Sequence, residues 1–131
     1  MATWDAVKTY LVGNYKLEMI GGGSLVKLLF EFGDGRSQVV FIQHHTDQNK
    51  KPTWLDFLSP IGKVAEIDLA AALRATEEYA SGGISQIGDL AMLRISVPME
   101  NLDRNEIEQP LEFVCVVGDE IEKALTGQDV F

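Results

Sequence analysis

Three side chains in this sequence are of the types that most often hold metals or act as nucleophiles, but their spacing suits neither role. His44 and His45 are adjacent, and neighbouring residues on a strand point to opposite faces, so the two rings cannot share one metal ion. No second cysteine or histidine lies nearby to complete a zinc site. Cys115 lies between two valines in an acidic segment, where a thiolate would be disfavoured. We therefore expect a buried structural cysteine, no metal site and no cofactor.

The carboxylates are abundant, but their spacing favours solvated helix surfaces over catalysis. Adjacent acids at 77–78 and 119–120 fall on expected helices, and Asp119 precedes Lys123 by four residues, which predicts a surface ion pair. The glycines at 21–23 lack the lysine and the following helix of a phosphate-binding loop. No Gly-x-Ser-x-Gly elbow occurs. We expect no catalytic residues, and a protein that is not an enzyme.

Length and composition predict one acidic globular domain spanning 1–131. The chain has 131 residues, of which 46% are hydrophobic and 24% charged, and this is enough to bury a core. Its formal net charge of -9 argues against nucleic acid and anionic membranes as partners. One cysteine allows no internal disulfide, the N-terminus lacks a signal-peptide pattern, and no apolar run reaches about 18 residues. We expect a cytoplasmic protein.

Residues 25–43 are the most apolar stretch and predict the central hairpin of one sheet. Two runs rich in β-branched and aromatic residues flank Asp34-Gly35, a pair typical of the two-residue type I′ turn. Such a turn places Gly33 opposite Arg36 and fixes every later pair.

This register predicts two faces of different character, because directly opposed residues share a face. One face would be almost wholly apolar, with Val26, Leu28, Phe30, Phe32, Val39 and Phe41. The other would be mixed, with Leu25, Lys27, Leu29, Glu31, Gln38, Val40, Ile42 and His44. We expect the first face to be core. The second is too apolar for open water and too charged for a deep interior, which makes it the main functional clue.

The segment before this hairpin predicts a helix and a strand. Thr3 is expected to cap a helix whose apolar stripe is formed by Trp4, Val7 and Leu11. The alternation at 15–19 then predicts a half-buried strand.

The segment after the hairpin predicts another strand and another helix. The strand around 54–58 is expected to end at Ser59-Pro60, because proline cannot donate a hydrogen bond to a sheet ladder. Asp68 is expected to cap a helix over 69–80.

A second hairpin is expected around Gly88-Asp89, which suits a type II′ turn because glycine takes its first position. One face of this hairpin would carry Ile84, Leu93, Ile95 and Val97. The other would carry Ile87, Leu90 and Met92, near Arg94 and Ser96.

The C-terminal third predicts a long acidic helix. Asp103 and Glu106 are spaced as a capping box, and Pro110 inside the helix removes one backbone hydrogen bond. Gly118 lies on the expected buried stripe, where it predicts a close approach to the sheet or to another helix. That stripe comprises Ile107, Leu111, Val114, Gly118, Ile121 and Leu125.

Together these elements predict an α+β domain with an antiparallel sheet of five to six strands and three helices, in the order α-β-β-β-β-α-β-β-α. Antiparallel sheets commonly leave one face open. The candidate interface on that outer face comprises Leu25, Leu29, Val40, Ile42, Ile87, Leu90 and Met92. A contiguous patch of several hundred Å² would mark a protein-binding surface. The alternative is that the first helix crosses this face and makes it interior.

The segment 84–125 carries a family resemblance. A short hairpin with a Gly-Asp turn is followed by Ser96-Val97-Pro98-Met99, an Asn-Leu-Asp bend at 101–103 and a long acidic helix. This layout resembles the type III secretion chaperone-like superfamily, including its YbjN-type members outside secretion systems. The resemblance implies a homodimer that binds a polypeptide segment, without enzymatic chemistry or a cofactor. Pro110 inside the last helix departs from the family pattern.

The leading hypothesis is a non-enzymatic protein-binding module, chaperone-like or regulatory, that acts as a homodimer and binds a polypeptide partner through an apolar sheet face or edge. Two alternatives remain. One is a small-molecule-binding domain or small enzyme with a pocket between the sheet and the C-terminal helix, near Pro110. The other is an acidic immunity-type protein that neutralises one basic partner.

Overall fold

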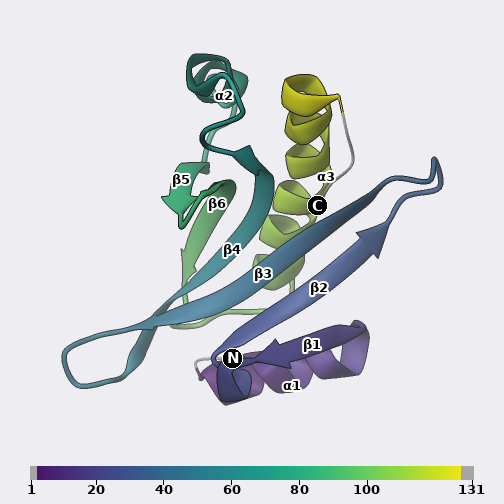
Figure 1. The fold of residues 1–131 in the computed structure, drawn as a ribbon. Coiled ribbons are helices and arrows are strands. Elements are labelled where there is room, and N and C mark those ends of the chain that lie inside the picture. The colour runs from purple at the N-terminus through teal and green to yellow at the C-terminus, as the bar shows by residue number, and fades with distance from the viewer. Residues whose placement is uncertain (1–2, 128–131) are drawn as a thin grey trace.

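The computed structural model describes residues 3–127, which form three α-helices, one short 3-10 helix and a six-stranded sheet (Figure 1). The order of elements confirms the α+β class and the predicted α-β-β-β-β-α-β-β-α arrangement. The elements are α1 (Trp4–Asn14), β1 (Leu17–Ile20), η1 (Gly21–Gly23), β2 (Leu25–Glu31), β3 (Ser37–Thr46), β4 (Pro52–Lys63), α2 (Leu69–Ala75), β5 (Gly83–Ile87), β6 (Leu90–Pro98) and α3 (Asn105–Thr126).

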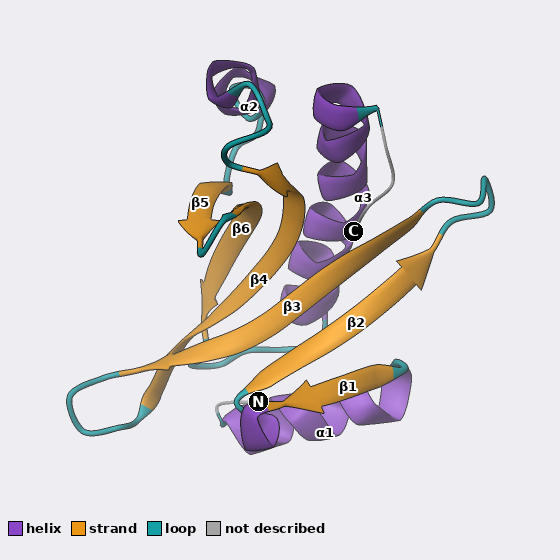
Figure 2. Cartoon of the chain, viewed as in Figure 1, coloured by secondary structure: helices purple, strands orange, loops and turns teal. Residues whose placement is uncertain are grey.

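The sheet is antiparallel throughout, with the strand order β1-β2-β3-β4-β6-β5. All three helices pack on one side of it, which we call the covered face. His44 on β3 stacks on Trp4 of α1, and Gln38 on the same strand lies beneath Gly118 of α3. Helix α2 lies against Ile84 of β5, on the same face. Figure 2 views the sheet from the opposite side, which we call the open face, with β1 crossing in front of α1.

The register of the central hairpin differs from the prediction by one residue. The loop contains three residues, because Phe32 N–H donates to the carbonyl of Arg36 at 2.7 Å and closes a pair around Gly33, Asp34 and Gly35. A type I′ turn needs positive φ at both Asp34 and Gly35, but only Gly35 has it. The left-handed glycine instead adds one residue to the loop. A slip of one residue transfers every side chain to the opposite face.

Two element boundaries also differ from the prediction. Strand β4 continues through Pro60 to Lys63, and a register shift between Pro60 and Gly62 accommodates the proline. Helix α2 ends at Ala75, because the amide and hydroxyl of Thr76 both donate to the carbonyl of Leu73 and tighten the last turn.

The local signals for helix starts and for the second hairpin are confirmed. Thr3 accepts a hydrogen bond from Ala6 N–H, and Asp68 accepts one from Ala71 N–H. Asp103 and Glu106 accept from each other's amides, as a capping box requires. The second hairpin has its two-residue turn at Gly88-Asp89, with positive φ at the glycine alone, as a type II′ turn needs.

Helix α3 lies close to the sheet at Gly118, as its place on the buried stripe predicted. A Cβ at this position would lie 2.9 Å from Ser59 Oγ, and Ser59 itself is fully buried on β4. Asp119 Oδ1, one residue further on, lies 2.9 Å from Nε of Arg36, the residue before β3. The predicted surface pair of Asp119 with Lys123 is therefore wrong, because the tertiary fold brings a closer cation to the aspartate.

We expect Gly118→Ala to lower the free energy of unfolding by about 1–3 kcal/mol, because a methyl group placed against buried Ser59 overpacks the core. The matched control is Gly13→Ala in α1, where a new Cβ meets nothing within 4 Å. Gly13→Ala should raise stability by about 0.5–1 kcal/mol through helix propensity. Urea unfolding of both variants measures the difference. Equal effects of the two substitutions would contradict the close approach of α3.

Candidate functional site

The structure divides the predicted interface between the two faces of the sheet. Val40 and Ile42 are fully buried on the covered face, so their predicted exposure is wrong, and the one-residue loop difference is the reason. Helix α1 packs on this covered face through His44, so it lies on the same side of the sheet as Val40 and Ile42 and not on the side of the residues that alternate with them. The remaining members lie on the open face, as strand alternation places them; they are Leu25, Leu29, Ile87, Leu90 and Met92. Leu29 and Ile87 are exposed and Leu25 and Leu90 half-buried, but Met92 is only 5% exposed, so its predicted exposure is also wrong.

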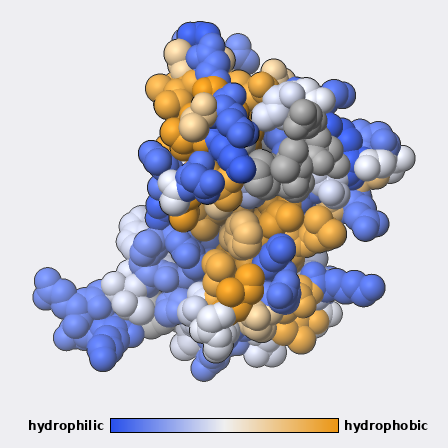
Figure 3. Space-filling view, viewed as in Figure 1, coloured by the Kyte–Doolittle hydropathy of each residue, from blue (hydrophilic) through white to orange (hydrophobic). Residues whose placement is uncertain are grey.

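A continuous apolar stripe crosses the open face over three strands. Leu29 of β2 lies opposite Val39 of β3, and Phe41 of β3 lies opposite Leu58 of β4. Leu29 is 55% exposed, Val39 and Phe41 are half-buried, and Leu58 is buried. Figure 3 shows apolar side chains gathered over the middle of the molecule on this side, bordered by hydrophilic ones. Val39 and Phe41 were predicted as core, and the register difference brings them here.

A polar cluster built around Asp56 adjoins this stripe. The Asp56 carboxylate is fully buried and accepts hydrogen bonds from Ser96 Oγ at 2.5 Å, Gln43 Nε2 at 3.1 Å and Arg94 Nη2 at 2.9 Å. His45 Nε2 also contacts this carboxylate and lies 2.9 Å from Arg94 Nη2. Strand alternation aligns these five residues on the open face, across β3, β4 and β6.

The environment of Asp56 keeps its carboxyl group ionised. Burial by itself raises the pKa of Asp56, but the hydrogen bonds from Ser96 and Gln43, with the charges of Arg94 and His45, outweigh it. The net result is a pKa below the ordinary value of 3.8. The carboxylate therefore fixes the positions of Arg94 and His45 on the open face and is unsuited to donating a proton at neutral pH.

The two histidines lie on opposite faces, as their adjacency predicted. His44 stacks on Trp4, with the ring centroids 4.8 Å apart, and burial lowers its pKa. His45 joins the Asp56 cluster on the other side of the sheet. Across residues 3–127, no three His, Cys, Asp or Glu side chains gather closely enough to hold a metal ion.

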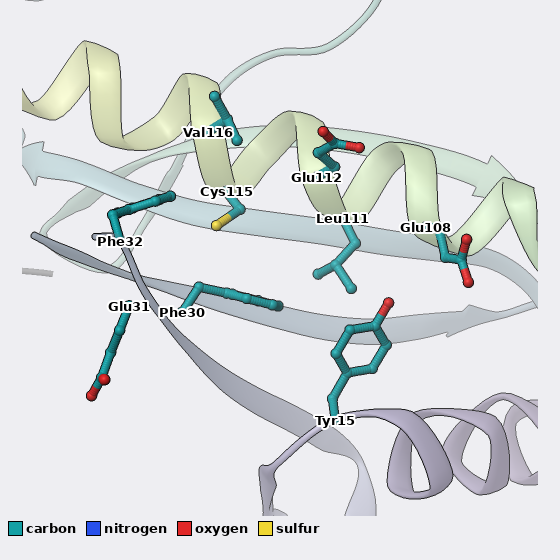
Figure 4. Close-up of a pocket in the computed structure, with 9 residues that line it drawn as sticks. All are labelled: Tyr15, Phe30, Glu31, Phe32, Glu108, Leu111, Glu112, Cys115 and Val116. Atoms are coloured by element: carbon teal, nitrogen blue, oxygen red, sulfur yellow. The ribbon is translucent and has the colours of Figure 1, made fainter. Parts of the chain in front are cut away.

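A cavity of about 400 Å³ lies between α3 and β2, the position predicted for the alternative small-molecule pocket. Figure 4 shows its wall of apolar side chains converging from three parts of the chain: Tyr15 before β1, Phe30 on β2, and Leu111 and Cys115 on α3. The ring centroids of Tyr15 and Phe30 are 6.1 Å apart and nearly perpendicular. The complete lining is Tyr15, Phe30, Glu31, Phe32, Glu108, Leu111, Glu112, Cys115 and Val116.

Two side chains in or beside this cavity, Cys115 and Tyr10, have raised pKa values. Burial raises the pKa of the Cys115 thiol to about 11, and the nearby Asp119 and Glu112 carboxylates add to the shift, so the thiol stays protonated at neutral pH. This confirms a buried cysteine. Tyr10 donates a hydrogen bond to Glu108 at 2.5 Å, and burial together with this bond raises the pKa of Tyr10 to about 12. Neither group is activated as a nucleophile.

No protein-family model matches the chain, and no curated protein matches it either. Within the part of the chain that the structure describes, no helix is both long enough and apolar enough to cross a membrane.

Sequence reasoning missed the Asp56 cluster and most of the cavity lining. Asp56 stands between Leu55 and Phe57 in an apolar strand, and a carboxylate in such a run needs partners on neighbouring strands. That signal was present in the sequence. Its partners Arg94 and Ser96 are about 40 residues away, and only strand pairing brings them together.

We expect Asp56→Asn to lower the free energy of unfolding most strongly above pH 3.8. The folded-state pKa of Asp56 is lower than its unfolded value, so its ionised form stabilises the fold above that value. This stabilisation is lost as pH falls through the folded pKa. Urea unfolding between pH 2 and pH 7 should therefore show the wild type and Asp56→Asn converging at low pH. The control Asp89→Asn removes the same charge from an exposed turn. Its free energy of unfolding should differ from that of the wild type by the same amount at every pH. A difference that disappears at low pH in this control as well would contradict the assignment.

Proposed function

We propose that this chain is a non-enzymatic protein-binding module, chaperone-like or regulatory, which acts as a homodimer and binds a polypeptide partner through the open face or an edge of its sheet. The observation that carries the proposal is the one-sided placement of the three helices, which leaves the apolar stripe around Leu29 and Phe41 without a helix over it. We propose a cytoplasmic location, on the basis of the single cysteine.

The composition of the open face supports protein binding. A stripe of apolar side chains beside a fixed group of charged ones is the usual make-up of an interface centre and its rim. Leu29 and Trp54 are both large, apolar and exposed, at 55% and 47%, and they lie on either side of the Asp56 cluster. The rigid Arg94 offers directed hydrogen bonds to a partner's carbonyl or carboxylate groups.

The edge of the sheet supports binding of an extended segment. Strand β5 is an edge strand, and it contains no proline, no charged residue and no bulge, the usual devices that protect such edges. A polypeptide added there would continue the antiparallel pairing. As part of this proposal we retain the similarity to the type III secretion chaperone-like superfamily. The similarity was drawn from the predicted order of elements, and the structure has that order.

The cavity between α3 and β2 supports a second candidate function, a small-molecule-binding domain. A concave space of about 400 Å³ with an apolar wall and several polar groups at its margin falls within the size range of ligand sites. We keep this as the alternative function.

We expect Leu29→Glu to weaken the homodimer by about 2 kcal/mol or more, because a charge would replace an apolar side chain at the proposed interface. The matched control is Leu73→Glu on α2, where the leucine is 63% exposed but lies away from the open face. Sedimentation velocity over a range of concentrations measures both variants. A wild type that remains a monomer at every concentration, or a control that dissociates as readily as Leu29→Glu, would count against the proposal.

A further inference from the structure

The lining of the cavity between α3 and β2 contains acidic side chains and no basic ones. Three of its nine lining residues are carboxylates, Glu31 on β2 and Glu108 and Glu112 on α3, and none is a lysine, arginine or histidine. All three are exposed residues, and Figure 4 shows the carboxylates of Glu31 and Glu112 pointing away from the apolar wall. The acids therefore lie at the solvent-exposed margin of the cavity, and most of the remaining lining is apolar.

The interior of the cavity offers aromatic faces and no competing cation. Tyr15, Phe30 and Phe32 supply three rings, and Leu111 and Val116 supply aliphatic surface. Aromatic faces attract cations, and they also bind apolar groups. The protonated thiol of Cys115 adds no charge.

We propose that this cavity binds an organic cation, an apolar aryl or alkyl group that ends in an ammonium. The inference rests on the second candidate function and names its ligand class. The apolar group would occupy the space beside Phe30 and Leu111, and the ammonium would lie at the entrance near Glu108 and Glu112. An anionic ligand of the same shape would bring its charge towards three carboxylates in a chain of net charge -9.

Two sources carry this chemistry, a free amine and a lysine side chain of a polypeptide. A lysine has an apolar stem of four carbons that ends in an ammonium, so it satisfies the same two features. The test below includes one arm for each source.

The test uses the full chain and three probes of one shape: phenethylamine, phenethyl alcohol and phenylacetate. Amide chemical shifts measured by NMR locate each probe and give its affinity. We expect the amine to bind more tightly than the alcohol and the alcohol more tightly than the acid, with shifts centred on Phe30, Leu111 and Cys115. A short acetylated peptide with one lysine between leucines tests the polypeptide source at the same signals.

Matched variants separate the charge of the entrance from the charge of the whole protein. In Glu108→Gln/Glu112→Gln, the amine should bind about threefold to tenfold more weakly and the alcohol unchanged, because two exposed ion pairs are lost. Glu77→Gln/Glu78→Gln removes the same net charge from exposed positions outside the cavity lining and should leave amine binding unaltered. Val116→Trp should weaken all three probes by filling the entrance.

Each contrary result has a distinct meaning. Equal affinity for amine, alcohol and acid would overturn the charge preference and leave a small-molecule site. Equal weakening by both double variants would also overturn it, since the effect would then come from overall charge. Absence of binding by every probe would overturn this inference together with the second candidate function. The first proposed function would stand in that case, because sedimentation of Leu29→Glu tests its homodimer separately.

Discussion

The register of β2 against β3 is the constraint on which the rest of this structure depends. The three-residue loop at 33–35 closes the pair between Phe32 and Arg36, and every later pair follows from it. It places Val26, Leu28, Val40 and Ile42 beneath the helices, where all four are buried. It leaves Leu29 and Phe41 on the opposite side. A shift of one residue would exchange these sets, so the loop decides which side chains form the core and which form a surface.

Side-chain hydrogen bonds connect β3 and β4 where the backbone pairing between these strands ends. The ladder between β3 and β4 ends at Phe41 and Leu58, and beyond this point Gln38 Nε2 donates to Ser59 Oγ at 2.7 Å and to the carbonyl of Pro60 at 2.8 Å. Ser59 Oγ in turn donates to the carbonyl of Val39 at 2.7 Å. These bonds satisfy groups that the separated strands would leave unpaired. They also explain why Gly118 is needed: α3 lies directly over this junction.

The two candidate surfaces have different physical origins. The open face exists because all three helices pack on the other side of the sheet, and its character comes from the apolar stripe and the charged group around Asp56. The cavity exists because α1 and α3 leave a space beside β2, and the bond between Tyr10 and Glu108 connects the two helices at one end of it. We propose a polypeptide partner for the first surface and an apolar organic cation for the second.

The sequence by itself determined the features that depend on neighbours a few residues apart. The caps at Thr3 and Asp68, the capping box at Asp103 and the turn at Gly88 follow from local hydrogen bonding and backbone preference, and all are present. The burial of Gly118 followed from a helical period of 3.6 residues.

The tertiary structure alone decided the register of the central hairpin, the face that the helices cover, and the partners of Asp56. A dipeptide such as Asp34-Gly35 is compatible with loops of two or three residues, and the packing of α1 and α3 against Val40 and Ile42 stabilises one of them. Arg94 lies 38 residues from Asp56 in sequence, so no local pattern could place it there. Periodicity gives the side chains that share a face, but the side on which the helices pack is set by contacts between distant elements.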